Sequence, residues 1–520
     1  MKAFLQRFGQ FVVGILHGFD RLRFRGSKRQ LCHVSGMMSW LGAMRMLLKD
    51  FKPWARDTTL SLCRAIEGPA EAAALYRYLN NSQDSKEQTA LQMAAEHKRT
   101  QGLIAVLGCV EPCQVIQVRG NPHTKKLELR VELAKCKHYY HYHLDPQYGL
   151  RYTRLQSWFP FTMHIGLNGR EWLGKQLDRA GIAYRKQDNC FPWLADFATA
   201  QQLADQQLTT AWPELLSGWA RQSNPLEETL LTCPVPYYWS VEAAEYASDI
   251  AFASAADLAR LYPLLVQHAL TTLQGTDVLR FMGYRVRQDG KPREDFAGEV
   301  TTRLKELVEG LCVKHHVLEN LLKMYDKFGA VLRLENLLRN VRDFKVYRTL
   351  ENDPDGPLAY RRMRKGVADL HQRAEVGRKI NERYAASLAT VAEATPLGEL
   401  AADLGQRQRW HGRSVRALNP LAAEDVALLE AVSRGEFVIS GFRNRDIRAI
   451  LYGDGAATNP AARKAQAGKV TRLLRLLRGH GLIAKIAKTH RYQLTDKGRT
   501  ALSALLAARK ANTKQLLQAA

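Results

Sequence analysis

The sequence predicts an α+β protein of several domains, with a helical N-terminal segment, an antiparallel-sheet body and a largely helical C-terminal domain. Apolar residues recur every three or four positions over residues 37–48, which is the period of one helix face. Residues 101–200 hold short runs of alternating, β-branched and aromatic residues, separated by turn residues such as Asn168-Gly169. From residue 421 onward, three helical patterns precede two short extended runs.

Composition and charge limit the class of protein. The chain has 520 residues, 46% of them hydrophobic, and its 76 Lys and Arg against 51 Asp and Glu give a formal net charge of +25. The apolar fraction excludes a disordered basic tail, since such chains lack the apolar surface that offsets the entropy of ordering. The surplus charge favours an anionic partner, nucleic acid before a membrane. No uncharged apolar run reaches the roughly 18 residues of a membrane span, and the eight scattered cysteines indicate a reduced, cytoplasmic protein.

Composition and turn residues divide the chain into five regions. The first 26 residues are expected to be a basic amphipathic segment of the mature chain, because charged residues follow the apolar run and no cleavage site is present. Residues 240–252 are expected to be helical. In chain order the regions are a mainly helical, basic N-terminal region (1–100), an α+β antiparallel sheet (101–200), a helical region (201–392) with a β-hairpin (311–338), a linker (393–420) and a C-terminal domain (421–520).

The C-terminal region carries the clearest pattern. Helical periodicity covers residues 425–432, 444–451 and 461–479, and extended runs follow at 482–486 and 491–495. With the string LLRLLRGHGLI…HRYQLTDKGR, this order resembles a winged helix-turn-helix domain. The resemblance implies that the third helix enters the major groove of DNA and that the hairpin acts as a C-terminal wing.

Cations crowd this domain. Between residues 441 and 500 the acidic residues are Asp446, Asp454 and Asp496. Two interpretations stay open: these cations bind phosphates and base edges, or they form a solvated face of a domain that contacts proteins. The residues expected to bind nucleic acid here, with His490 at the tip of the wing, are Arg443, Arg445, Arg463, Lys464, Lys469, Arg472, Arg475, Arg478, Lys488, His490 and Arg491.

A central segment, KMYDK followed by LRLE, resembles a hairpin of rolling-circle replication initiators of plasmids and filamentous phages. Tyr325, Asp326 and Lys327 match its first strand, and Arg333 and Glu335 match its second. The resemblance implies a metal-dependent DNA nickase, in which carboxylates hold Mg²⁺ or Mn²⁺ and a tyrosine attacks DNA. Asp326 and Glu335 would then be the catalytic metal ligands.

The nucleophile would be a tyrosine near these ligands, Tyr325 itself or Tyr384 on a helix further along the chain. Whether Asp326 and Glu335 share a face depends on the turn. A two-residue turn pairs 326 with 331 and puts 335 on the same face, and a turn one residue longer reverses this. A structural hairpin, whose Lys323 and Lys327 follow a phosphate backbone, stays open as the alternative.

Two clusters suggest other metals. His141 and His143 flank Tyr142, and a strand would point both imidazoles to one face. Metal-dependent nicking enzymes use a His-hydrophobic-His strand, from which the polar Tyr142 departs, so packing or contact with nucleic acid stays open. The second cluster is a zinc alternative of Cys109, Cys113, Cys136 and His138, set against two buried thiols that flank a turn.

Further basic residues form two groups, near residues 21–29 and 361–365. Phe24 lies among the first group, where it either stacks on a base or packs in the core. The residues expected to follow a nucleic-acid backbone are Arg21, Arg23, Arg25, Lys28, Arg29, Arg361, Arg362, Arg364 and Lys365.

Two functions follow as hypotheses. The first is a nucleic-acid-binding protein of mobile-element type, which recognises DNA through its C-terminal domain and nicks it at the central hairpin with Mg²⁺ or Mn²⁺. The second is a non-enzymatic protein that binds DNA or structured RNA in a ribonucleoprotein. The whole chain is also similar to a family of uncharacterised bacterial proteins, which implies no mechanism. No phosphate-binding loop, dinucleotide fingerprint or serine-hydrolase elbow is present.

Overall fold

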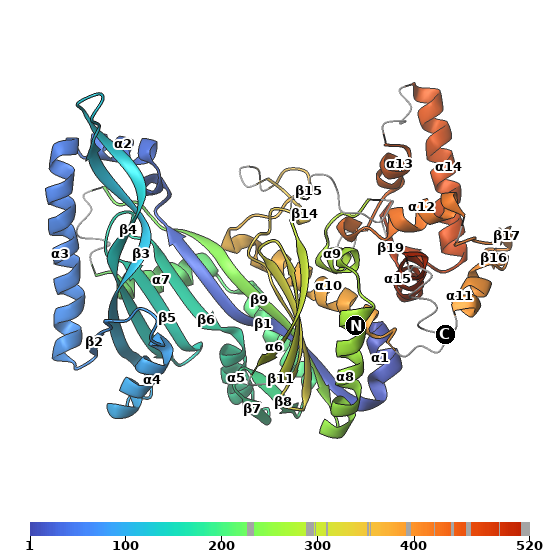
Figure 1. Ribbon diagram of the computed structural model, residues 1–520, viewed down its shortest axis with the longest axis horizontal. Coiled ribbons are helices and arrows are strands. Elements are labelled where there is room, and N and C mark those ends of the chain that lie inside the picture. The colour runs from blue at the N-terminus through green and yellow to red at the C-terminus, as the bar shows by residue number, and fades with distance from the viewer. Residues whose placement is uncertain are drawn as a thin grey trace. The chain divides into compact units, whose positions relative to one another are not determined.

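The structure is a computed structural model (Figure 1). It describes residues 1–225, 233–287, 296, 298–307, 310–350, 353, 355–391, 397–420, 422–437, 441–453, 459–487 and 489–510. The chain forms two compact units, and each unit contains both strands and helices. The first unit comprises Met1–His17, Tyr246–Met363 and Gln372–Ala520, and the second comprises Gly18–Glu245 and Arg364–His371. The expected combination of helices with a large, mostly antiparallel sheet is confirmed. No described helix is long and apolar enough to cross a bilayer.

The second unit is built on a sheet whose strands are antiparallel, except that its edge strand is parallel to its neighbour. The longest pair, β3 with β4, forms a hairpin. In spatial order the strands are β1 (Val12–Ser27), β6 (Met163–Asn168), β5 (Gly149–Gln156), β4 (Leu127–Asp145), β3 (Gly102–Gly120) and β2 (Tyr76–Tyr78). A separate small hairpin pairs β7 (Tyr184–Gln187) with β8 (Cys190–Leu194).

Helices of the second unit follow the apolar periods of the sequence. In α3 (Leu48–Ala72), Phe51, Leu62 and Ile66 share the buried face. In α5 (Gly169–Ala180), the Asn168 side chain accepts hydrogen bonds from the first turn, and Gly181, at φ 66°, ends the helix in a left-handed conformation. The others are α2 (Val34–Ala43), α4 (Lys86–Glu96), α6 (Phe197–Gln206) and α7 (Trp212–Ser223).

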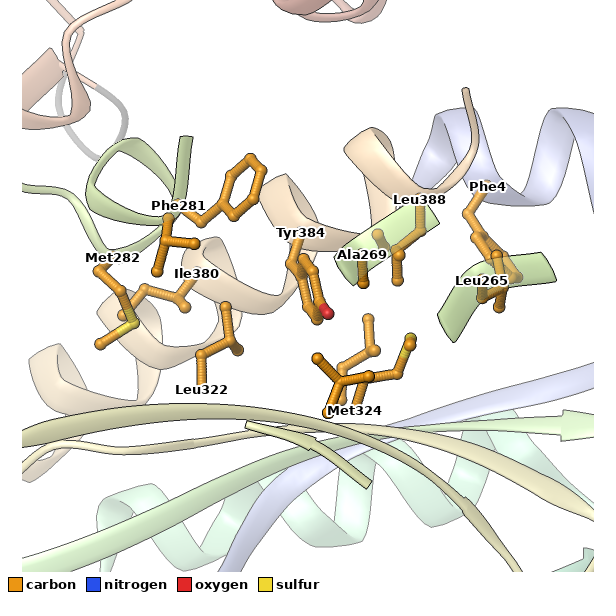
Figure 2. Packing of buried hydrophobic residues seen from close by; sticks show 14 of the residues in the cluster. Phe4, Leu265, Ala269, Phe281, Met282, Leu322, Met324, Ile380, Tyr384 and Leu388 are labelled. Atoms are coloured by element: carbon orange, nitrogen blue, oxygen red, sulfur yellow. The ribbon is translucent and has the colours of Figure 1, made fainter. Parts of the chain in front are cut away.

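The first unit contains an antiparallel meander that ends against the second half of β9 (Tyr238–Phe252). Its strands are β10 (Val300–Leu307), β11 (Gly310–Val317), β12 (Asn320–Lys327) and β13 (Val331–Leu337). Helices cover one face: α1 (Lys2–Phe8), α8 (Ala255–Thr271), α9 (Gly275–Met282) and α10 (Leu370–Leu388). Figure 2 shows the core between them, where Leu322 and Met324 of β12 face Tyr384 and Leu388 of α10.

The C-terminal part of the first unit has its own core, which includes Leu429, Val470 and Leu477. An isolated antiparallel bridge joins Phe442 to Tyr492 and extends its small hairpin. Five of its elements agree with the expected ranges to within two residues: α12 (Ala423–Val432), α13 (Asn444–Tyr452), α14 (Pro460–Gly479), β18 (Ile483–Lys485) and β19 (Tyr492–Leu494). Helix α15 (Asp496–Lys510) follows them.

Three expected segments are wrong. Residues 12–27, which fall in the region expected to be mainly helical, form strand β1, because Arg21, Arg23 and Arg25 alternate with buried residues at the period of a strand. Residues 240–252 lie in strand β9, where burial in a sheet overrides the helix propensity of an alanine-rich segment. The expected linker contains helix α11 (Leu397–Leu404) and a hairpin of β16 (Gln408–Trp410) with β17 (Arg413–Val415), because Leu404, Val415 and Leu418 belong to the C-terminal core.

Candidate nucleic-acid interface

Helix α14 is the best-formed candidate surface. Pro460 occupies its first turn, and the Asn459 side chain accepts a hydrogen bond from the Ala462 N–H at 2.7 Å. Val470, Leu474 and Leu477 are buried on one side. The helix therefore has one face fixed in the core and another that is exposed to solvent.

The exposed face carries cations. Lys464, Arg472 and Arg475 recur at spacings of eight and three residues, so they share one side of the helix, and all are exposed. Lys469 and Arg463, also exposed, flank this row. In the described part of the chain no carboxylate pairs with Lys464, Lys469, Arg472 or Arg475. The described residues of the domain thus leave the positive charge of this face without an ion pair.

Helix α13 fixes the position of α14. The Nδ2 of Asn444 donates to the carbonyl oxygen of Ala467 and to Oγ1 of Thr471, both at 2.9 Å. The Asp446 side chain accepts a hydrogen bond from the Arg443 N–H at 2.8 Å and so caps α13. Sequence reasoning missed Asn444, because a side chain that joins two helices has no periodic signal.

Other expected contacts of this domain divide by exposure. Arg445 is exposed, 3.7 Å from Asp446, and His490 is exposed in the turn after β18. Arg443 and Arg478 are half-buried, and the Arg478 guanidinium lies 4.5 Å from the ring centre of Trp410. Lys488 lies outside the described residues. The domain can therefore present Arg445 and His490 beside α14.

Arg491 does not fit the expected interface. It is only 7% exposed, and its guanidinium lies 4.7 Å from the ring centre of Tyr360 and 5.2 Å from that of Tyr347. Its Nη2 also lies 3.4 Å from the carbonyl oxygen of Gly441. These contacts hold the side chain inside the fold, so we interpret Arg491 as a packing residue.

The basic residues of β1 are only partly available. Arg21 and Arg23 are exposed, and Arg25 is half-buried on the same face of the strand. Arg23 lies 3.8 Å from Glu242, which offsets part of its charge. Phe24, on the other face, is buried with its ring 4.9 Å from that of Trp212, so it packs in the core and does not face a base.

Next to this strand, Lys28 is buried, and its Nζ donates to the carbonyl oxygen of Val235 at 2.5 Å. A long-range contact of this kind cannot be read from a basic run, and it contradicts the expected surface role of Lys28. Arg29 is exposed and lies 3.1 Å from the ring centre of Tyr238.

The second basic group belongs to different elements. Arg361 and Arg362 lie on β15 (Ala359–Arg362), which pairs with β14 (Lys345–Arg348), and Arg362 is the exposed one. Arg364 is held by Asp369 at 2.7 Å, whereas Lys365 is exposed. Of this group, Arg362 and Lys365 therefore remain accessible to a polyanion.

The central hairpin separates the two expected metal ligands. Its loop holds three residues, 328–330, because Lys327 pairs with Val331 and Tyr325 pairs with Arg333. Asp326 pairs with Leu332 and so points to the opposite face from Glu335. Asp326 instead accepts a hydrogen bond from the Gly329 N–H at 2.9 Å and closes the turn. The two carboxylates do not form a shared site.

Glu335 is buried and has partners of its own. The Tyr325 hydroxyl donates to its Oε2 at 2.8 Å, and Lys323 donates to its Oε1. Burial would raise the pKa of Glu335, but the charges of Lys323 and Arg333 and these hydrogen bonds hold it below its usual value. Lys327 is buried and Lys323 is partly buried beside Glu335, so neither side chain is placed to follow a phosphate backbone of nucleic acid.

Tyr384 is not presented to solvent. Its side chain is fully buried on α10, and its hydroxyl lies 2.9 Å from Nε2 of His315. Burial raises the pKa of Tyr384 well above its usual value, which disfavours the phenolate. A DNA phosphate has no access to this hydroxyl in the structure, so the expected nucleophile lacks its geometric basis.

His141 and His143 do share one face of β4, as expected from the alternation. Burial lowers the pKa of His141 to about 4 and, with the positive charge of Arg151, that of His143 to about 3. The Nη1 of Arg151 lies 3.5 Å from Nδ1 of His143. A fixed guanidinium beside the imidazoles disfavours a bound cation, so we interpret the pair as buried and neutral.

The buried imidazole of His141 predicts a pH dependence of stability. In the unfolded chain the imidazole of His141 binds a proton below about pH 6.5. In the folded protein it binds this proton only near pH 4. The free energy of unfolding is therefore not affected by protonation of His141 above about pH 6.5. It falls by about 1.4 kcal/mol per pH unit as the pH decreases from 6.5 toward 4. Urea unfolding from pH 7 to 4.5 should show a shallower pH dependence for His141→Gln than for the wild type. His123→Gln, at an exposed turn position, is the control, and equal slopes for both variants would contradict the prediction.

Comparisons of the chain with protein-family models, with curated proteins and with solved structures find no match.

Proposed function

We propose that this protein binds duplex DNA through its C-terminal part, which acts as a winged helix-turn-helix domain with α14 as its recognition helix. One observation carries the proposal. Among the residues that the structure describes, the exposed face of α14 presents Lys464, Arg472 and Arg475 without a neutralising carboxylate, while its opposite face is fixed in the core. The order of helices and hairpin supports the same assignment.

Small residues support a close approach of α14 to a groove. Ala461, Ala465 and Gly468 lie between or beside the cations on the exposed side. The major groove admits an α-helix, lysines neutralise phosphates, and arginines form paired hydrogen bonds with guanine. The hairpin of β18 and β19, with the exposed His490 in its turn, would lie against the adjacent backbone or minor groove.

The proposed function is DNA binding, without cleavage of DNA at the central hairpin. Asp326 and Glu335 lie on opposite faces of the hairpin, and the Tyr384 hydroxyl is buried. Without a shared carboxylate site and an accessible tyrosine, the hairpin does not supply the parts of a metal-dependent nickase. We therefore favour the non-enzymatic function of the two hypotheses.

Binding and nicking can be measured on the full-length protein. Fluorescence anisotropy should give tighter binding to duplex DNA than to single-stranded DNA or to a structured RNA of equal length. Supercoiled plasmid incubated with Mg²⁺ or Mn²⁺ should be retarded on a gel without conversion to open circles. Tighter binding to the RNA would replace DNA by structured RNA as the partner, and open circles lost in Asp326→Ala would overturn the non-enzymatic function.

A further inference from the structure

The β3–β4 hairpin gathers three metal-ligating side chains outside the proposed interface. Figure 1 shows strands β3 and β4 side by side. Cys113 lies on β3, and Cys136 and His138 lie on β4. Cys113 pairs with Ala134 and Glu111 pairs with Cys136, so the three side chains share one face of the sheet. Their potential ligand atoms all lie within 4.8 Å of one another.

This arrangement differs from the spacing that the sequence offered. Cys109 and Cys113 lie within one strand and do not flank a turn. Cys109 is buried opposite His138 and is outside the close group, and burial beside Glu111 raises its pKa to about 11. Strand register, not the Cys-x₃-Cys spacing, therefore brings the donors together.

We propose that Cys113, Cys136 and His138 form a binding site for a thiophilic divalent cation of the zinc class, with a fourth position for water. Two thiolates and one imidazole are the donors that Zn²⁺ prefers. A zinc–sulfur bond of about 2.3 Å places two sulfurs of a tetrahedral site about 3.8 Å apart. The Sγ atoms of Cys113 and Cys136 lie 2.9 Å apart here, so a modest rotation of either side chain suffices.

The surroundings suit a metal ligand. Nδ1 of His138 lies 3.2 Å from the carbonyl oxygen of Cys136, which leaves Nε2 for a ligand, as in most metal-binding imidazoles. Arg154, the cation nearby, is paired with Glu111 at 2.8 Å. Both thiols are partly exposed and His138 is buried, so an ion can reach the sulfurs from solvent.

Cobalt titration of the full-length protein tests the site directly. Protein freed of metal with a chelator should bind a single equivalent of Co²⁺ with thiolate-to-cobalt charge-transfer absorption, and Zn²⁺ should abolish that absorption. Cys113→Ser, Cys136→Ser and His138→Ala should each weaken binding by about 100-fold or more. Cys32→Ser, a partly exposed cysteine outside the group, is the matched control and should bind like the wild type.

Two results would overturn the site: Co²⁺ bound without charge-transfer absorption, or Cys113→Ser binding as tightly as the wild type. Circular dichroism checks that each variant is folded. Where a variant does not fold, alkylation of the wild type decides. Zn²⁺ should slow iodoacetamide modification of Cys113 and Cys136 but not of Cys32, and equal rates with and without Zn²⁺ would contradict the proposal.

Discussion

Arg333→Met should lower the free energy of unfolding by about 3–5 kcal/mol. Arg333 is fully buried, and its Nε and Nη2 donate to the two carboxylate oxygens of Asp249 at 2.6 and 2.9 Å. Methionine fills similar space but leaves the carboxylate of Asp249, only 2% exposed, without this partner. Because an uncompensated buried charge is costly, the loss exceeds the value of the ion pair itself.

The double variant Arg333→Met/Asp249→Leu separates these two causes. It removes both charges, so it should recover at least half of the stability that Arg333→Met loses. Arg260→Met, in an exposed pair with Asp257, is the surface control and should cost less than about 1 kcal/mol. Urea unfolding measures all three variants. If Arg333→Met costs no more than Arg260→Met, the buried pair does not hold the hairpin against β9.

The triple variant Lys464→Ala/Arg472→Ala/Arg475→Ala should weaken binding of the full-length protein to duplex DNA by about 100-fold or more. Each arginine that pairs with a base contributes about 1–3 kcal/mol, and the lysine removes a phosphate contact. All three side chains are exposed and pair with no carboxylate in the described ranges of the chain, so the domain should remain folded. Anisotropy measures the affinity, and thermal unfolding checks the fold.

A matched control removes the same charge elsewhere. Arg303, Lys305 and Arg339 are exposed cations of the meander and its following turn. Their triple alanine variant lowers the net charge equally but leaves α14 intact, so its affinity should change by less than about threefold. Equal losses in the two triple variants would show that DNA responds to net charge and not to α14.

The C-terminal elements could be predicted from sequence because their signals are local. The apolar spacing of Val470, Leu474 and Leu477 gives the period of a helix, and short extended runs give the hairpin. Strand β9 could not be predicted in this way. Its alanines favour a helix locally, and only neighbouring strands make them part of a sheet.

The sequence predicted the exposure of a site residue correctly only where the helical or strand period shows which side chains face solvent. Nothing in the sequence places Tyr360 beside Arg491 or Val235 beside Lys28. The metal hypothesis at the central hairpin depended on a loop length that the sequence left open, and one additional residue in the loop sends Asp326 to the other face.

Salt dependence of duplex DNA binding distinguishes a recognition helix from a solvated basic face. Each phosphate contact adds about 0.9 to the slope of log affinity against log salt concentration. We expect a steep slope for the wild type and a slope shallower by about 1 for Lys464→Ala/Arg472→Ala/Arg475→Ala, because this variant removes one phosphate contact. Identical slopes for the two proteins would contradict the assignment of α14 as the DNA-binding helix.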